Sequence, residues 1–240
     1  RQRCSIKMSL FSRFTPIEIH RRRCLKFANS KNCPDYLKAF YQRGLPNANS
    51  FIDECHFTSI DFETTRIDPN KDYVLSIGGI CLRKGAIDFT TSFHYYVNNS
   101  KFIKKDSAVI NHITPEQLEQ GKEPVTAMIE LLDKISGGLV LMHCMYIETN
   151  FIKSTLGLRK KDPLPFISLD TMAIERQLHH DASVEDVRLS AIRERRGFPA
   201  YEAHNALVDS LATAEVFLAQ EKDVFKNKRP YLLPLYKRSL

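Results

Sequence analysis

The sequence lacks the features that mark membrane-spanning and secreted proteins. Its longest apolar runs, such as residues 138–142 ("GLVLM"), are far too short to cross a bilayer. The basic residues that follow Arg1 do not precede an apolar stretch of signal-peptide length. We therefore expect a protein that has no membrane partner and works in the cytoplasm.

The cysteines lack a pattern. Six are scattered along the chain with no CxxC pair and no regular spacing, at positions 4, 24, 33, 55, 81 and 144. This spacing argues against a zinc knuckle and against a disulfide framework, so we expect reduced thiols. The sequence also has no internal repeat and no low-complexity tract. With 240 residues it is long enough for one large domain with a full core.

Acidic residues are scarce only in the first fifth of the chain. Residues 1–50 contain 11 Lys and Arg against 2 Asp and Glu, whereas residues 51–240 contain 24 against 26. Such a basic segment often binds phosphate backbones, and the alternative is a solvated arm that aids solubility. A linker-like Gly/Pro/Asn/Ser cluster precedes residue 51, and basic residues recur near the C-terminus. We expect a small helical basic N-terminal extension (1–50), a main domain (51–221) and a basic C-terminal tail (222–240).

Hydrophobic patterning in the main domain predicts an α/β fold. Three strand-like runs come first, and alternating strands and helices follow, which favours a central mixed β-sheet flanked by helices. Thr114 begins a "TPEQ" helix start with a capping residue. The expected strands are 56–63, 73–83, 86–97, 138–143 and a run from 166; the expected helices include 124–135, 146–156, 184–197 and 204–220. The last helix is expected to bury a stripe of Leu207, Leu211, Ala214 and Leu218.

Two acids interrupt the first of these strands. In "SIDFETT" (59–65), Asp61 and Glu63 alternate with apolar residues, so both project from the same face. Their Cα atoms would lie about 6.5 to 7 Å apart, and two desolvated negative charges raise each other's pKa unless a cation lies between them. The pair is therefore either part of a metal site or a solvated face of an edge strand.

Two more acids follow other strands. Glu148 comes shortly after the strand at 138–143, and Asp209 lies in the first turns of the last helix. Four carboxylates from three elements suit two divalent ions that act in phosphodiester hydrolysis. His204, with an ordinary pKa of about 6.5, is suited to take a proton from the attacking water. Taken singly, His204 is also compatible with a cap or surface position, and Asp209 with stabilisation of the helix dipole.

These motifs together resemble the DEDDh 3′→5′ exonucleases, the family that includes the proofreading epsilon subunit of bacterial DNA polymerase III. The resemblance covers residues from about 55 to 220. "SIDFETT" resembles the first family motif, and "LVLMHCMYIETNFI" (139–152) resembles the second. "HNALVD" (204–209) is similar to the third, with the spacing of the histidine-type subgroup. "VINHITPEQLEQG" (109–121) resembles the segment that the family usually writes as His-Gly-Ile-Thr.

The resemblance implies a ribonuclease H-like exonuclease fold and a two-metal site. Asp61, Glu63 and Asp209 would hold one Mg²⁺ or Mn²⁺ ion, and Asp61 and Glu148 would hold a second. His204 would activate the attacking water and, with Glu63, is expected to be catalytic. Backbone groups around Thr64 and Thr65 would seat the 3′-OH of the terminal nucleotide. Tyr146 would either stack on a base or pack in the core.

Two positions depart from the family pattern. Glu148 stands where the second motif has Asp, and Arg66 stands where Gly commonly follows "ETT". The expected function is a metal-dependent 3′→5′ exonuclease that removes nucleoside 5′-monophosphates from single-stranded or frayed DNA. The alternatives are an exoribonuclease acting on short RNA or tRNA 3′ ends, and a nucleic-acid-binding protein with a degenerate nuclease site. The extra material lies at the N-terminus, which favours a stand-alone enzyme of repair or turnover over a polymerase subunit.

Overall fold

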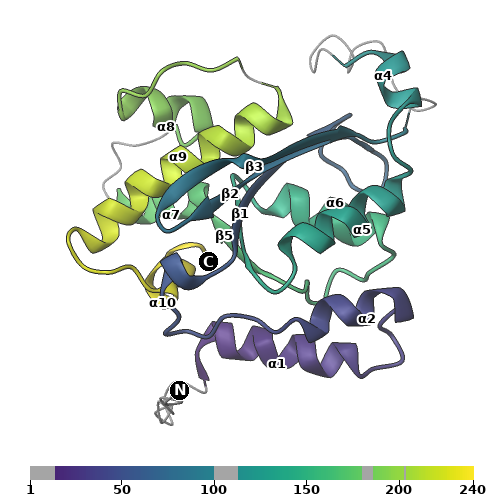
Figure 1. The fold of residues 1–240 in the computed structure, drawn as a ribbon, viewed down its shortest axis with the longest axis horizontal. Coiled ribbons are helices and arrows are strands. Elements are labelled where there is room, and N and C mark those ends of the chain that lie inside the picture. The colour runs from purple at the N-terminus through teal and green to yellow at the C-terminus, as the bar shows by residue number, and fades with distance from the viewer. Residues whose placement is uncertain (1–13, 100–112, 180–185, 203) are drawn as a thin grey trace.

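A five-stranded mixed β-sheet forms the centre of the fold (Figure 1). The computed structural model describes residues 14–99, 113–179, 186–202 and 204–240. The strand order is β3-β2-β1-β4-β5, with β1 antiparallel to β2 and parallel to β4. The predicted mixed sheet and α/β class are therefore confirmed. The strands are β1 (Phe57–Thr64), β2 (Val74–Arg83), β3 (Ala86–Tyr96), β4 (Leu139–Met142) and β5 (Ile167–Asp170).

Helices cover both faces of the sheet. Figure 1 shows α5 and α6 on one side, with α7 and α9 on the other. None of the helices in the described ranges is long and apolar enough to cross a bilayer. The α-helices are α1 (Pro16–Ala28), α2 (Asp35–Gln42), α4 (Pro115–Glu119), α5 (Pro124–Ile135), α6 (Tyr146–Thr155), α7 (Thr171–Leu178), α8 (Leu189–Arg195), α9 (Ala206–Phe225) and α10 (Leu232–Arg238), with a short 3₁₀ helix at Ile52–Glu54.

The alternation of side chains along β1 divides them between two hydrophobic cores. Ile60 and Phe62 pack with Phe151 of α6 in one cluster. Phe57 points to the opposite face, where its ring meets Phe217 of α9 edge to face at 4.9 Å between ring centroids. Because strand side chains alternate with period two, the odd-numbered residues of β1 all face α9.

The first helices are joined to the body of the protein. Leu37, Phe40 and Tyr41 of the first 50 residues lie in the same cluster as Ile60. The Tyr41 hydroxyl also donates a hydrogen bond of 2.6 Å to the Pro163 carbonyl. The described part of the basic N-terminal segment is thus a packed element and no solvated arm. The domain boundaries near 50 and 221 stay predictions.

The C-terminal residues predicted as a tail include a packed helix. Helix α9 extends to Phe225, and α10 follows it with Leu232 and Leu235 fully buried. The predicted start of a helix at Thr114 is confirmed, because the Thr114 side chain and Gln117 form a reciprocal capping box. Residues 109–112, the first part of the His-Ile-Thr segment, lie outside the described residues.

The buried face of α9 differs from the predicted stripe. Of the four residues expected there, only Ala214 is fully buried, while Leu207, Leu211 and Leu218 keep part of their surface exposed. Small side chains predominate on the buried face because the helix lies very close to the sheet. Its members include Ala206, Ser210, Thr213, Ala214, Phe217 and Gln220.

Candidate active site

Three carboxylates converge on the side of β1 that faces α9. Asp61 and Glu63 come from β1, and Asp209 comes from the first turn of α9. One oxygen from each of these carboxylates lies within 4.8 Å of the other two. The structure therefore brings together three of the four acids that the sequence predicts as metal ligands.

The approach of α9 depends on a glycine. Gly78 pairs with Asp61 across β1 and β2. A Cβ added at Gly78 would lie 2.2 Å from the carbonyl carbon of Ala206 and 2.2 Å from the nitrogen of Leu207. Only a hydrogen atom fits there, so the first turn of α9 can reach the strand and carry Asp209 to the other acids. A glycine within a strand is a sequence signal for such a close backbone contact, and periodicity analysis misses it.

A fourth carboxylate comes from a third element. Glu148 lies in the first turn of α6 and is only 3% exposed. Its Oε2 atom has no hydrogen-bond partner among the described residues. Burial and then the neighbouring Glu148 carboxylate are the leading causes that raise the pKa of Asp61. Glu148 thus completes the acidic cluster, although it is not one of the three carboxylates within 4.8 Å.

Asp170, at the end of β5, fixes the start of α6. It accepts hydrogen bonds of 3.0 Å from the backbone N–H groups of both Cys144 and Met145. Cys144 has a left-handed backbone with φ of 69°, so the turn that leads to Glu148 needs this support. Asp170 also caps α7 through the N–H of Met172. Sequence analysis misses this role, although an acid between a strand and a helix is a typical capping signal.

The pKa values of the four acids are all raised. Burial raises the pKa of Glu63 to about 8, and the charge of Asp209 adds to the effect. Burial also raises the pKa of Glu148 to about 8, with a contribution from Asp170. Burial raises the pKa of Asp209, although hydrogen bonds from the backbone of His204 and Asn205 oppose it. The cluster holds more negative charge than its surroundings neutralise.

The cluster fits a divalent metal ion. Among the described residues, none of the four carboxylates forms an ion pair with Lys or Arg. Carboxylate oxygens are the ligands preferred by hard cations such as Mg²⁺ and Mn²⁺. A bound cation would give the Glu148 oxygen a partner and would lower the raised pKa values of the four acids. The residues present therefore fit the predicted metal, whose identity and number remain proposals.

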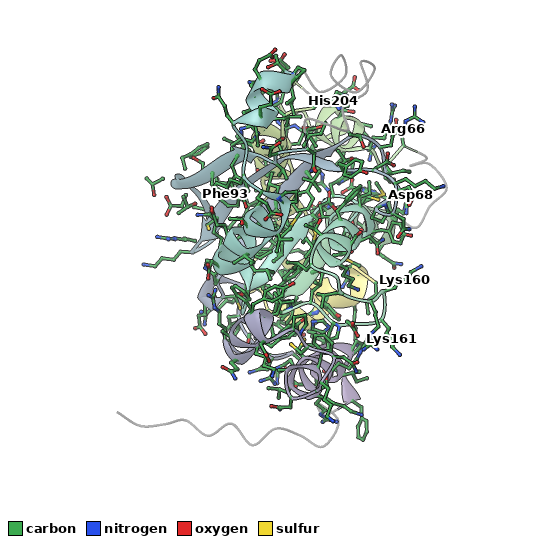
Figure 2. The ribbon with its side chains drawn as sticks, turned by 90° about the vertical axis from the view of Figure 1, so that its right-hand side faces the viewer. Arg66, Asp68, Phe93, Lys160, Lys161 and His204 are labelled. Atoms are coloured by element: carbon green, nitrogen blue, oxygen red, sulfur yellow. The ribbon has the colours of Figure 1, made fainter. Side chains whose placement is uncertain are left out.

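His204 borders the cluster from the loop before α9. It is exposed, its φ is 67°, and its backbone N–H donates a 3.0 Å hydrogen bond to Oδ2 of Asp209. With Asp61 and Asp209 it lines a cleft of about 740 Å³. Figure 2 shows His204 in the upper part of the molecule. The predicted base thus lies beside the carboxylates on an open cleft.

A buried arginine, not predicted from the sequence, holds the loop that carries His204. Arg193 of α8 donates to the Pro199 carbonyl at 2.9 Å and pairs with Glu215 of α9. Its guanidinium lies 4.1 Å from the centre of the Tyr201 ring, and Tyr201 donates to Glu215. Since Arg193 touches both the loop and α9, it positions His204 relative to Asp209.

The remaining predicted residues lie around the end of β1 and the start of α6. Thr64 follows a register shift in the β1–β2 ladder. The Thr65 hydroxyl bonds with Asp72, and the Thr65 N–H donates to the Tyr73 carbonyl at 2.9 Å. Their contact with a substrate stays a proposal. Tyr146 is 61% exposed, so the prediction that it packs in the core is wrong, and base stacking remains a proposal.

Comparison with known proteins assigns the family. A family model described as "Exonuclease", of the RNase T type, matches residues 58–217. The chain belongs to this exonuclease family. The match contains Asp61, Glu63, Glu148, His204 and Asp209 and ends within α9. The resemblance to the DEDDh exonucleases is thereby confirmed.

Curated members of related exonuclease groups align with most of the chain. DNA polymerase III PolC-type from Thermotoga petrophila is 29% identical over 71% of this chain, which corresponds to 12% of that protein. The chain thus spans about an eighth of the length of such relatives. DNA polymerase III subunit epsilon from Treponema pallidum is 27% identical, over 67% of this chain and 74% of that protein. Ribonuclease T from Buchnera aphidicola is 28% identical, over 66% and 79%.

Solved structures support the fold. E. coli exonuclease I in complex with a dT13 oligonucleotide has a TM-score of 0.59 to this exonuclease-family chain, at 14% identity. The similarity covers 71% of this chain and 42% of exonuclease I. At this identity it shows the ribonuclease H-like fold alone, in agreement with the sheet and helices described above.

Proposed function

We propose that the protein is a metal-dependent 3′→5′ exonuclease that removes nucleoside 5′-monophosphates from single-stranded or frayed DNA ends. The observation that carries the proposal is the convergence of Asp61, Glu63 and Asp209 within 4.8 Å, beside Glu148 and His204. Asp61, His204 and Asp209 line one cleft, which supports a shared site for residues from β1, α6 and the start of α9. Their arrangement meets the needs of phosphodiester hydrolysis.

Each of these residues has a role in the proposed reaction. Asp61, Glu63 and Asp209 would hold one Mg²⁺ or Mn²⁺ ion, and Asp61 and Glu148 would hold a second. When bound, the metal would neutralise the negative charge that develops on the phosphate oxygens. The imidazole of His204 takes a proton from the attacking water, whose oxygen forms a bond to phosphorus. The bond between phosphorus and O3′ of the penultimate nucleotide breaks, and this O3′ receives a proton.

The cleft beside the carboxylates suits the terminal nucleotide. Its walls include apolar surface from Leu189, Phe198 and Tyr201, next to the polar groups of His204 and Asp209. An apolar wall accepts the faces of a base, and the segment around Thr64 and Thr65, which follows Glu63 at the end of β1, is proposed to contact the 3′-OH. DNA as substrate is supported by relatives named as DNA polymerase III components.

A second substrate class has its own support. The relative named ribonuclease T aligns over 79% of its length, so an exoribonuclease acting on short RNA or tRNA 3′ ends is the alternative. The 2′-hydroxyl distinguishes the two substrates, and the residues near the terminal sugar decide whether it is tolerated.

One assay tests the proposal. Stepwise release of mononucleotides from a DNA oligomer and its RNA counterpart is followed with Mg²⁺, Mn²⁺ or EDTA. We expect metal-dependent shortening from the 3′ end, with DNA the better substrate, and no shortening by the Asp61→Asn variant. Asp133→Asn, which changes an exposed acid on α5 by the same charge, is the matched control and keeps full activity.

The outcomes separate the candidates. Faster shortening of RNA would replace DNA by RNA as the substrate class. Binding of both oligomers without shortening, in the wild type and with either metal, would overturn the proposal in favour of a nucleic-acid-binding protein with a degenerate site. In that case Glu148, which stands in place of the family's Asp, is the first residue to exchange, because Glu148→Asp would restore the activity.

A further inference from the structure

A strip of cations leads from the active-site loop to the N-terminal helix. We define the basic strip as Arg66, Lys153, Lys160, Lys161 and Arg23. Figure 2 shows Arg66, Lys160 and Lys161 along one edge of the molecule, with Arg66 uppermost. The five residues come from three segments that are far apart in the sequence, namely the β1–β2 loop, the α6 region and α1.

Hydrogen bonds connect these three segments to one another. The Ser154 hydroxyl at the end of α6 donates to the Pro69 carbonyl of the β1–β2 loop at 2.7 Å. Lys153 donates to the Lys160 carbonyl at 2.9 Å, and Arg23 of α1 donates to the Lys161 carbonyl at 2.6 Å. The strip begins close to the carboxylates, because Glu148 and Lys153 are five residues apart on α6, or about 7.5 Å along its axis.

The cations of the strip are not neutralised by acids. Among the described residues, none of the five forms an ion pair with Asp or Glu. The two acids nearby are occupied, because Asp68 pairs with Lys71 and the buried Asp162 pairs with Arg159. Burial and then the charge of Arg23 lower the pKa of Lys153, and the charge of Asp162 opposes this effect.

A hollow lies within the strip. It has a volume of about 180 Å³, and its lining includes Arg23, Lys153, Thr149 and the carboxylate of Asp162, which is paired with Arg159. Two cations around a concave surface form a suitable site for a phosphate group, whose charge would relieve their repulsion. An extended series of such cations matches the regular spacing of phosphates along a nucleic-acid strand.

We propose that the basic strip binds the phosphate backbone of a single-stranded substrate, several nucleotides upstream of the 3′ end that lies at the carboxylates. The proposal rests on the exonuclease function proposed above and assigns a role to the N-terminal extension. Helix α1 is part of the substrate path, since Arg23 closes the strip at its far end. Single-stranded nucleic acid fits better than a folded partner, because the strip is narrow and extended, and the acids beside it, Asp68 and Asp162, are paired with other cations.

The test compares two charge-matched double variants. Lys160→Glu combined with Lys161→Glu reverses two exposed side chains, and both residues accept hydrogen bonds through their backbone carbonyls, which the substitutions keep. Lys84→Glu combined with Lys134→Glu makes the same charge change outside the strip, at the β2–β3 turn and beside Phe93, which Figure 2 shows at the opposite edge. Binding of a fluorescent DNA oligomer of about 20 nucleotides is measured by anisotropy in EDTA, at about 50 and about 200 mM salt.

We expect the strip variant to bind the long oligomer roughly ten-fold more weakly at the lower salt, with a salt slope reduced by about 1.4. The control variant should stay within about a factor of two of the wild type. Hydrolysis of the p-nitrophenyl ester of thymidine 5′-monophosphate, which is too short to reach the strip, should be unchanged in both variants. Equal loss of binding in both variants, or loss of ester hydrolysis in the strip variant, would overturn the proposal.

Two further results are decisive. If the strip variant loses affinity for a blunt duplex and keeps its affinity for the single strand, the proposed occupant is wrong. If the wild type hydrolyses neither the ester nor the oligomer, the proposed exonuclease function fails, while the anisotropy measurement still decides whether the strip binds the strand.

Discussion

Two buried glutamates in this protein have opposite surroundings. Glu148 on α6 and Glu175 on α7 each follow a strand of the sheet, and they are 3% and 1% exposed. Glu175 accepts hydrogen bonds of 2.9 Å from Arg196 and from Gln220, and these contacts lower its pKa although burial opposes them. Glu148 has an oxygen without a partner, and its pKa is raised to about 8.

The difference shows that burial alone does not identify a functional acid. Glu175 has the partners that a buried charge needs, so it ties α7 to α8 and α9 and its role is structural. Glu148 lacks such partners within the described chain, and three further acids surround the same space. A buried carboxylate whose charge is not compensated within the folded protein is a good candidate for binding a ligand such as a metal ion.

Removing the charge of Glu148 should have the largest effect. We expect Glu148→Gln to lower the exonuclease rate by roughly 100-fold or more, because a ligand that stabilises charge in the transition state is lost. The metal-free variant should nevertheless be more stable than the wild type near pH 8, since repulsion within the cluster falls. Turnover of the thymidine ester and thermal unfolding measure the two effects; a variant that is both active and less stable would contradict the comparison.

The substitution Glu175→Gln should lower stability and leave the reaction rate unchanged, which is the reverse of the effect of Glu148→Gln. We expect Glu175→Gln to lower the free energy of unfolding by about 2 kcal/mol, because Arg196, whose side chain is 15% exposed, loses a charged partner. The rate per folded molecule should equal that of the wild type. Denaturant unfolding and turnover at a temperature well below the transition would check this. A large loss of rate without loss of stability would place Glu175 in the catalytic machinery.

The stability of the metal-free protein should also depend on pH, as a fall in melting temperature shows. Glu63 and Glu148 have pKa values raised from 4.5 to about 8, so they bind more protons folded than unfolded. The metal-free protein should therefore lose stability as the pH rises from about 4.5 to about 8.

Magnesium should reverse this loss, because the ion competes with protons for the carboxylates. We expect Mg²⁺ to raise the melting temperature more at about pH 8 than at about pH 6. In the Glu148→Gln variant, Mg²⁺ should raise the melting temperature by less than it does in the wild type. An equal increment at both pH values would mean that the ion binds elsewhere on the protein.

Much of the fold could be predicted from residue patterns. The strands around Ile60 and Ile77 follow from β-branched and aromatic periodicity, and the helix after Thr114 follows from its capping residues. The acids of the site could also be found, because they follow strand ends and the spacing from His204 to Asp209 matches a known motif. Their convergence is visible only in the structure, which brings together residues nearly 150 positions apart.

Other features could not be read from local patterns. The predicted apolar stripe of α9 was right in part, because Ala214 is buried and Leu211 and Leu218 pack against the core. The small buried side chains near Gly78 were not predicted, because hydrophobicity favours leucines. The supporting roles of Asp170 and Arg193 depend on partners far along the chain. Helix α10 lies in a segment whose basic composition favoured a tail. Each of these features is set by tertiary packing, which overrides local preference.

The contact between Gly78 and α9 has a consequence for how the sequence can vary. Gly78 offers no functional group, yet an added methyl group would meet the backbone of Ala206 and Leu207. If every residue were substituted in turn and the activity measured, nearly all replacements of Gly78 should abolish activity. The same result is expected for Asp61, which pairs with Gly78 across β1 and β2. A search for essential residues by chemical type would pass over Gly78, although this missing side chain shapes the site as much as the acids do.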